Sequence, residues 1–210
     1  MLISKKAINL IISEEVSSQK NYEKKLMGII WPGGESGATI GIGYDLGYVT
    51  AEEIERDWRY EIGSSQVAIL KMFAGLRGEK AKRAVQLNMV SKQVQIPFAS
   101  ATNVFIKTSL KKFGRSANTI YPGLDKLFPD AIGGIVSMVY NRGTKLEGER
   151  RTEMKAIVPL VAAQDYDGIA EQIEASKRLW DNGLVQRRIK EAALVKNSNR
   201  QYSNDELIEV

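Results

Sequence analysis

The sequence predicts an α+β fold that is mainly helical, with a short strand-containing lobe near the N-terminus. Apolar residues recur at helical spacing through most of the 210 residues, which favours a series of amphipathic helices. One glycine-rich stretch, residues 39–44, instead alternates as a short strand does, and a dense run of turn residues precedes it. We therefore expect a single domain over residues 1–210, with a strand-bearing lobe at 1–92 and a helical lobe at 93–210.

Local signals define the elements of the first lobe. Residues 3–17 carry apolar side chains near one broad face, which predicts a helix. Thr50 and Glu53 have the spacing of a capping box, so a helix is expected to begin there and to run to about residue 62. The same helical pattern continues at 64–74 and 78–90.

The second lobe is predicted from the same periodicity. After the break at residues 96–98, helical patterns occupy 99–113, 129–140, 152–163, 165–180 and 184–196, followed by a polar tail at 197–204. Trp180 is expected in the core. Arg187 and Arg188 are expected on a solvated basic face.

Composition excludes several kinds of catalysis. Cysteine and histidine are both absent, so serine–histidine and cysteine–histidine mechanisms and HExxH zinc sites are excluded. Acid–base chemistry near neutral pH must then come from Asp, Glu, Lys or Tyr. We expect neither a metal nor a cofactor.

The net charge of +5 leaves two interpretations open. A basic surface favours anionic polymers such as those of the bacterial envelope, but the same charge could serve solubility alone. No dense basic stripe with interleaved aromatic residues is present, so nucleic acid is not an expected partner. The apolar patch near the N-terminus is too short for a secretory signal or a membrane span.

One nine-residue motif resembles that of a particular protein family. Gly37-Ala38-Thr39-Ile40-Gly41-Ile42-Gly43-Tyr44-Asp45 closely resembles the active-site hairpin of phage-type lysozymes, glycoside hydrolase family 24. Residues 137–143, Ser-Met-Val-Tyr-Asn-Arg-Gly, are similar to the central helix of that family and its exit. Residues 177–188 resemble its closing segment of tryptophan and arginine. The resemblance covers roughly residues 1–50 and 95–195.

The resemblance implies a lysozyme-like fold and a muramidase that hydrolyses the β-1,4 bond between N-acetylmuramic acid and N-acetylglucosamine. Its catalytic glutamate would be Glu15, with Glu14 as the alternative, and its threonine would be Thr39. The second acid falls at Asp45, six residues after the threonine, as in the pesticin-like branch; Glu35 is the rival. The partner would be bacterial peptidoglycan. We expect a monomer made in the cytoplasm without a cleaved signal and delivered to the wall.

Those residue types suit glycoside hydrolysis. A glutamate at the edge of an apolar helix face can stay protonated near neutral pH, because desolvation raises the pKa of a carboxyl group. Periodicity does not choose between Glu14 and Glu15; the resemblance chooses Glu15. Asp45 and Thr39 would hold a water molecule on the opposite face of the sugar. The alternatives are that Asp45 only shapes a turn before Gly47 and that Thr39 only favours a strand.

The remaining site residues are expectations of the same kind. Tyr44, Tyr140, Asn141 and Arg142 are assigned to substrate binding, although aromatic residues more often pack in a core and Asn-Arg-Gly also ends helices. A different class of function stays open at this point. The chain could be a non-catalytic peptidoglycan-binding module that keeps the cleft but not the chemistry.

Overall fold

The computed structural model describes residues 1–87, 92–181 and 183–210, and it forms two compact units. The first, called here the terminal unit, comprises Met1–Glu14 and Leu110–Val210; the second, the internal unit, comprises Glu15–Ser109. The division therefore falls at residues 14/15 and 109/110 instead of the expected 92/93. Both units are mainly helical, and the described residues also form two two-stranded sheets. The mainly helical α+β class is confirmed.

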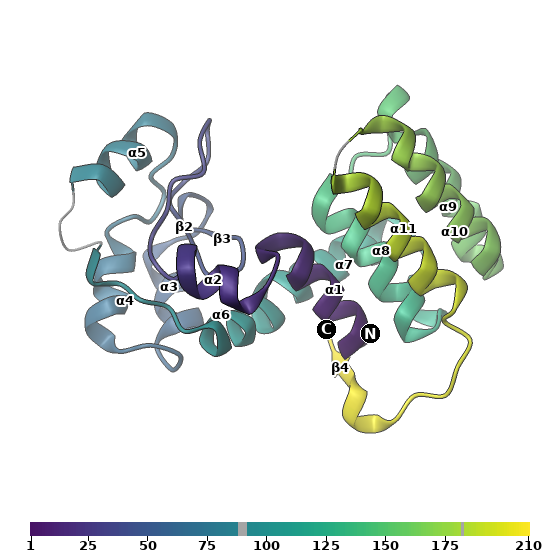
Figure 1. Cartoon of the computed structure of the whole chain (residues 1–210), viewed down its shortest axis with the longest axis horizontal. Coiled ribbons are helices and arrows are strands. Elements are labelled where there is room, and N and C mark those ends of the chain that lie inside the picture. The colour runs from purple at the N-terminus through teal and green to yellow at the C-terminus, as the bar shows by residue number, and fades with distance from the viewer. Residues whose placement is uncertain (88–91, 182) are drawn as a thin grey trace. The chain divides into compact units, whose positions relative to one another are not determined.

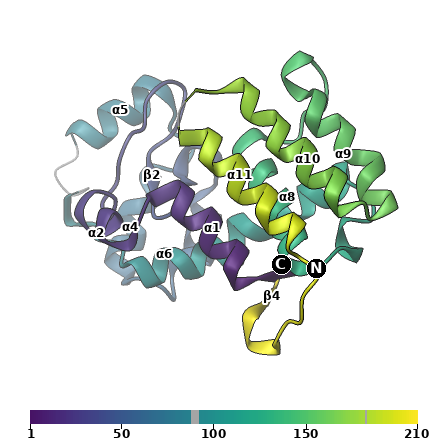
Figure 2. The same cartoon turned by 45° about the vertical axis from the view of Figure 1, so that its right-hand side comes forward.

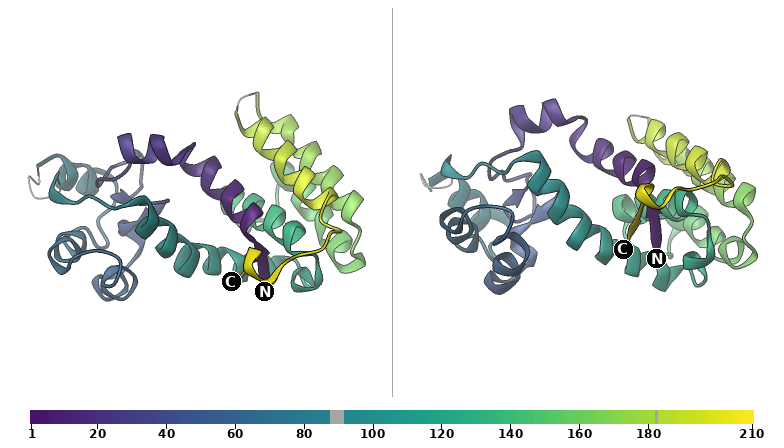
Figure 3. Two further views of the ribbon diagram at one scale, coloured as in Figure 1. Left: turned by 60° about the horizontal axis from the view of Figure 1, so that its bottom comes forward. Right: turned by 90° about the horizontal axis from the view of Figure 1, so that it is seen from below.

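The two chain ends meet in the terminal unit. Strand β1 (Leu2–Ser4) pairs antiparallel with β4 (Leu207–Glu209), so the N- and C-termini lie side by side (Figures 1–3). The helix expected at 3–17 is therefore shorter: α1 spans Lys5–Val16. The fully buried Asp130 accepts hydrogen bonds from Ser4 Oγ and, at 2.8 Å, from Arg200 Nε, which ties the tail to β1.

Helix α8 (Pro129–Arg142) is the core of the terminal unit and is buried along most of its length. It packs against β1, α7 (Lys111–Ile120) and α11 (Gly183–Lys196). Two glycines allow this packing: a β-carbon on Gly133 would lie 2.1 Å from the β-carbon of Ala7, and one on Gly134 would lie 2.9 Å from the carbonyl oxygen of Glu191. Any side chain there would push α1 or α11 away.

Helices α9 (Thr152–Ala163) and α10 (Tyr166–Ala175) complete the terminal unit, and α10 lies beside both α9 and α11 (Figures 1 and 2). Short helical turns at Leu124–Lys126, Glu149–Arg151, Ser176–Leu179 and Asn204–Glu206 connect the longer elements. The expected helices at 129–140, 152–163 and 184–196 are all present. The one expected at 165–180 ends earlier, with a tighter turn in its last residues.

The expectation of a solvated face at Arg187 and Arg188 is wrong. Their side chains are 2% and 0% exposed, and both donate hydrogen bonds to Glu191 Oε1 at 3.0 Å. Ser137 Oγ donates to the same oxygen at 2.5 Å. The three charged residues lie three and four positions apart on α11, so they meet on one helix face and can be buried together. Burial lowers the pKa of Arg188 and raises that of Glu191.

The internal unit contains the strand motif. Its elements are α2 (Gln19–Lys25), β2 (Thr39–Ile40), β3 (Tyr44–Asp45), a helical turn at Leu46–Tyr48, α3 (Ala51–Trp58), α4 (Ser64–Lys71), α5 (Gly78–Leu87) and α6 (Phe98–Val104). The capping box is confirmed, since Thr50 Oγ1 accepts from Glu53 N and Glu53 Oε2 accepts from Thr50 N. The last three residues of the helix expected at 78–90 lie outside the described residues.

Two further features concern the length of the helices. After α6 the helix continues through a π-helical segment, Phe105–Leu110, into α7, so the helical run is longer than the expected 99–113. No helix in the described parts of the chain has the length and apolar character needed to cross a membrane.

Candidate functional site

The β2–β3 hairpin brings together two of the three predicted catalytic residues. Thr39 pairs directly with Asp45, and Ile40 pairs with Tyr44. Directly opposed residues on antiparallel strands point to the same face, with β-carbons about 4.5–5.5 Å apart. The turn between the strands depends on Gly41 and Gly43, whose φ angles of 58° and 68° are strained for other residues.

Asp45 is held by the backbone around it. Its Oδ1 accepts from Gly47 N at 2.8 Å and its Oδ2 accepts from Gly37 N at 3.2 Å. The carboxylate therefore shapes the turn before Gly47, as one interpretation of the sequence expected. Because an ionised carboxylate has about four acceptor positions, these two bonds leave capacity for a water molecule or a ligand. The side chain is rigidly placed and half-buried.

Thr39 is fixed through its backbone and not through its hydroxyl. Its N–H donates to the Ile30 carbonyl at 2.7 Å, and its carbonyl accepts from Ile30 N at 2.9 Å. The hydroxyl makes no hydrogen bond with the residues that the structure describes, and it lies across the strand pair from Asp45. A hydroxyl in this position can accept from a water molecule and donate to a carboxylate.

The remainder of the internal unit supports the hairpin. A β-carbon on Gly41 would lie 3.2 Å from the Trp58 ring and 3.3 Å from the Ala101 β-carbon, so the turn rests against α3 and α6. The segment from Gly75 to the start of α5 is bonded to the residues on either side of the hairpin, because Gly75 N donates to the Leu46 carbonyl and Gly78 N to the Ser36 carbonyl, each at 3.0 Å. The hairpin therefore sits on a packed scaffold.

The two candidate acids at the end of α1 differ in their surroundings. Glu14, the last residue of its part of the terminal unit, has a side chain only 15% exposed, and its Oε1 accepts from Lys190 Nζ at 2.8 Å. Glu15, the first residue of the internal unit, is exposed. Burial thus distinguishes Glu14 from Glu15, which periodicity alone could not do. Glu14 forms an ion pair with Lys190.

The rival acid Glu35 lies in the exposed loop before β2. Gly33 and Gly34 precede it with φ angles of 110° and 58°. Its carboxylate lies beside Gly78, 3.3 Å from the position of a β-carbon there, and accepts no hydrogen bond from the described residues. Glu35 therefore lacks the backbone support that Asp45 has.

Tyr44 lies in the core of the internal unit and not on its surface. The residue is 6% exposed, its hydroxyl donates to Asp57 Oδ2 at 2.9 Å, and its ring meets Trp58 edge-on at 5.4 Å. Burial, together with the hydrogen bond to Asp57, raises the pKa of the phenol. Tyr44 therefore stabilises the hairpin by packing in the core of the internal unit.

The other predicted substrate-binding residues lie in the terminal unit, at the end of α8. Tyr140 is half-buried, with its ring 4.6 Å from that of Phe113. Asn141 is exposed, and its Oδ1 accepts from Arg188 Nη2 at 3.3 Å. Arg142 is 7% exposed and donates to the Arg150 carbonyl. Asn141 and Arg142 line a pocket of about 540 Å³.

Trp180 also lines this pocket, which corrects the expectation that it belongs to the core. It is half-buried, and the guanidinium carbons of Arg142 and Arg188 lie 5.2 and 5.7 Å from its ring centroid. Sequence reasoning also missed Arg150 and Arg151, which line the same pocket. The sequence does contain two adjacent arginines, in the Gly-Glu-Arg-Arg run at 148–151, but nothing in that run predicts that they line a pocket.

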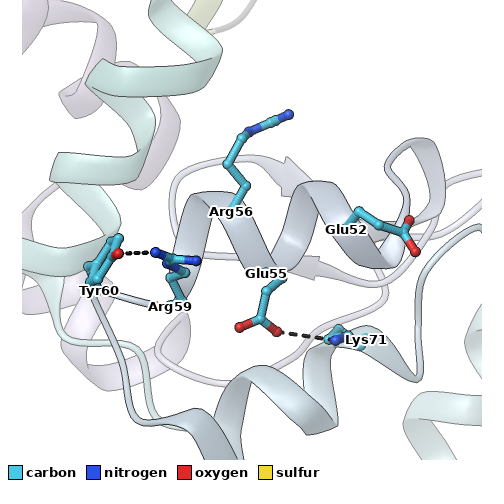
Figure 4. A pocket seen from close by; sticks show the side chains of 6 residues that line it. All are labelled: Glu52, Glu55, Arg56, Arg59, Tyr60 and Lys71. Atoms are coloured by element: carbon cyan, nitrogen blue, oxygen red, sulfur yellow. Dashed lines mark hydrogen bonds and ion pairs between the residues drawn. The ribbon is translucent and has the colours of Figure 1, made fainter.

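A second hollow, of about 440 Å³, lies on α3 and α4 (Figure 4). Its lining consists of Glu52, Glu55, Arg56, Arg59, Tyr60 and Lys71. Glu55 is paired with Lys71 at 3.1 Å, and Arg59 donates to the Tyr60 hydroxyl. Its acids are solvated surface groups, so it offers no enclosed carboxylate for catalysis. Within the described residues no three acidic side chains converge as a metal site would require.

Comparison with known proteins places the hairpin inside a defined family. No curated protein matches the sequence. Residues 16–120 match a family described as a domain of unknown function (DUF8812). The match spans the internal unit almost completely and includes Thr39 and Asp45, whereas Glu14 and Glu15 lie just before it. The chain belongs to this family, the domain of unknown function DUF8812.

Proposed function

We propose that the protein is a muramidase with a lysozyme-like fold, hydrolysing the β-1,4 bonds between N-acetylmuramic acid and N-acetylglucosamine in bacterial peptidoglycan. The observation that carries the proposal is the Thr39–Asp45 pair. A threonine with an unengaged hydroxyl stands opposite an aspartate fixed by two backbone N–H groups, on the hairpin that resembles the active-site hairpin of phage-type lysozymes.

The pair suits the water-activating half of the reaction. An inverting glycosidase holds a water molecule between the sugar and a carboxylate, with its two carboxyl groups about 6.5–9.5 Å apart. Asp45 Oδ atoms would accept from that water and Thr39 Oγ1 would orient it. The backbone clamp matters because a misplacement of about 1 Å can cost on the order of a hundredfold in rate.

Glu15 is the proposed proton donor to the leaving oxygen. Glu14 is engaged by Lys190, which suits a structural role. Because Glu15 is exposed, the desolvation that keeps an acid protonated must come with the bound glycan, which excludes water from the side chain. We propose that the protein acts as a monomer on the wall, after release or delivery from the cytoplasm.

A non-catalytic wall-binding module is the second candidate. Two observations favour it. The Asp45 carboxylate already accepts a hydrogen bond that stabilises the turn before Gly47, and Glu15 is exposed. Such a module would bind peptidoglycan without shortening its glycan strands.

Digestion of purified peptidoglycan separates the two candidates. The full-length protein is incubated with the purified wall, and the soluble products are analysed by mass spectrometry, with the Glu15→Gln variant as the negative control. Reducing N-acetylmuramic acid ends that are absent with the variant would support the muramidase. Intact glycan with retained sedimentation of the protein on the wall would support the binding module. Intact glycan without binding would refute both.

A further inference from the structure

The pocket that contains Arg142 has an excess of positive charge. Arg142, Lys145, Arg150 and Arg151 line it, together with Asn141 and Trp180, and its volume is about 540 Å³. We call it the arginine pocket. All of its lining residues belong to the terminal unit. Glu147 and Glu149 also line it, so four cations face two acids and two positive charges remain.

Within the described part of the protein none of these four cations forms a direct ion pair with a carboxylate, although Glu153 lies near enough to attract Arg142. Other arginines of the same unit are paired: Arg178 with Glu153, Arg187 and Arg188 with Glu191, and Arg200 with Asp130. Of the four pocket cations, Lys145 and Arg150 are exposed to solvent, whereas Arg151 lies near the buried Arg142. Like charges held close together destabilise the fold unless an anion lies between them.

Arg142 is the most buried of the four cations. It is 7% exposed, and its Nη1 has no hydrogen-bond partner among the described residues, although a buried guanidinium normally finds one for each N–H group. Burial, with Arg151 and Arg188 nearby, lowers the pKa of Arg142 to about 10. The guanidinium rests against the Trp180 ring, which gives the pocket one apolar wall.

We propose that the arginine pocket binds a phosphate monoester of a small organic molecule. Near neutral pH a phosphate monoester carries about −1.5 to −2, which matches the two excess positive charges. The arginine fork presents parallel N–H groups at the spacing of phosphate oxygens. The pocket is larger than a bare phosphate requires, and the Trp180 side of the wall offers an apolar surface to the rest of the ligand.

The proposal does not depend on muramidase activity, because no residue of the hairpin takes part. Titration calorimetry of the full-length protein provides the test, with glycerol 3-phosphate, inorganic phosphate and succinate as probes. We expect one saturable site for glycerol 3-phosphate, weaker binding of inorganic phosphate, and no saturable binding of succinate. Arg150→Gln and Arg151→Gln should each weaken glycerol 3-phosphate about tenfold, as for one charged hydrogen bond.

Arg115→Gln is the matched control, since it removes the same charge from an exposed position on α7 of the same unit. Its affinity should stay within about twofold of the wild type, a change well below the energy of one charged hydrogen bond. Equal weakening by Arg115→Gln would show unspecific attraction to the surface and overturn the proposal. Absence of a saturable site, or succinate binding as tightly as glycerol 3-phosphate, would overturn it as well. Circular dichroism melting of each variant confirms that the fold is intact.

Discussion

A β-carbon on Gly37 would lie 2.2 Å from Asp45 Oδ1, so only glycine fits between this carboxylate and the backbone that holds it. The same β-carbon would meet Gly47 N at 2.3 Å. Gly37 and Gly47 therefore form a cradle whose N–H groups fix the Asp45 side chain. The position of the proposed catalytic carboxylate depends on two residues without side chains.

Gly37→Ala should displace Asp45 and destabilise the internal unit. Forcing a methyl group into a packed position costs about 1–3 kcal/mol of unfolding free energy. Urea denaturation measures the loss, and the rate of wall lysis should fall further than stability alone explains. Gly63→Ala is the control, because Gly63 has an ordinary φ of −64° and its β-carbon would be 4.0 Å from the nearest atom. If both variants behaved alike, the cradle would not be tight.

Local patterns in the sequence predicted most of the helices, and the structure shows why they sufficed. The capping box at Thr50 and Glu53 needs only four consecutive residues, and it forms as expected. The β1–β4 pair was missed because it joins residues 2–4 to residues 207–209, a contact that no local window contains. The residues that anchor the tail near β1, Asp130 and Arg200, are themselves distant in sequence from one another.

The candidate site was predictable to a similar degree. The resemblance singled out Thr39 and Asp45, but the single strand expected over residues 39–44 is wrong: Gly41 and Gly43 turn the chain between two short strands, and this turn places Thr39 opposite Asp45. The expectation for Arg187 and Arg188 is wrong because charge alone does not imply solvation: Glu191 follows them by four and three residues on the same helix and pairs with both. That spacing was the sequence signal for burial of all three.

Glu191→Gln should destabilise the terminal unit strongly. The substitution removes the carboxylate charge that both buried guanidinium groups share, and breaking a buried ion pair costs about 3–5 kcal/mol. Chemical denaturation followed by circular dichroism measures the change. Glu174→Gln, which breaks the exposed pair with Lys177, serves as control and should leave the midpoint almost unchanged. Similar midpoints for the two variants would contradict the buried network.

Binding to the anionic wall should weaken as salt rises. The net charge of +5 attracts an anionic polymer, and screening limits its reach to about 8 Å at physiological ionic strength. Sedimentation of the protein with purified peptidoglycan, at low and high sodium chloride, measures the effect. If the affinity for the wall stayed constant across the salt series, the excess of basic residues would serve solubility alone.

Glu15→Gln should abolish lysis without unfolding the protein, because an amide cannot deliver a proton to the leaving oxygen. Glu14→Gln should keep most of the activity and lose only its ion pair with Lys190, a lysine whose side chain is 54% exposed. Turbidity of a wall suspension gives the rate, and thermal melting checks the fold of both variants. An inactive Glu14→Gln beside a lytic Glu15→Gln would identify Glu14 as the catalytic acid, and the match to the lysozyme family would then be one residue out of register at this helix.

The second carboxylate is decided by comparing Asp45→Asn with Glu35→Gln. Asp45 is held by the N–H groups of Gly37 and Gly47, whereas Glu35 lies exposed in a glycine-rich loop without a bonded partner among the described residues. An amide cannot take the proton of the attacking water as a carboxylate does, so Asp45→Asn should cost about a hundredfold or more in lysis rate. Thr39→Ala should fall between the wild type and Asp45→Asn, since it removes one of two groups that orient the water. Because asparagine can still accept at Oδ1, the turn should survive, and thermal melting should show an intact fold. An inactive Glu35→Gln beside a lytic Asp45→Asn would transfer the role to Glu35 and leave Asp45 as a turn residue.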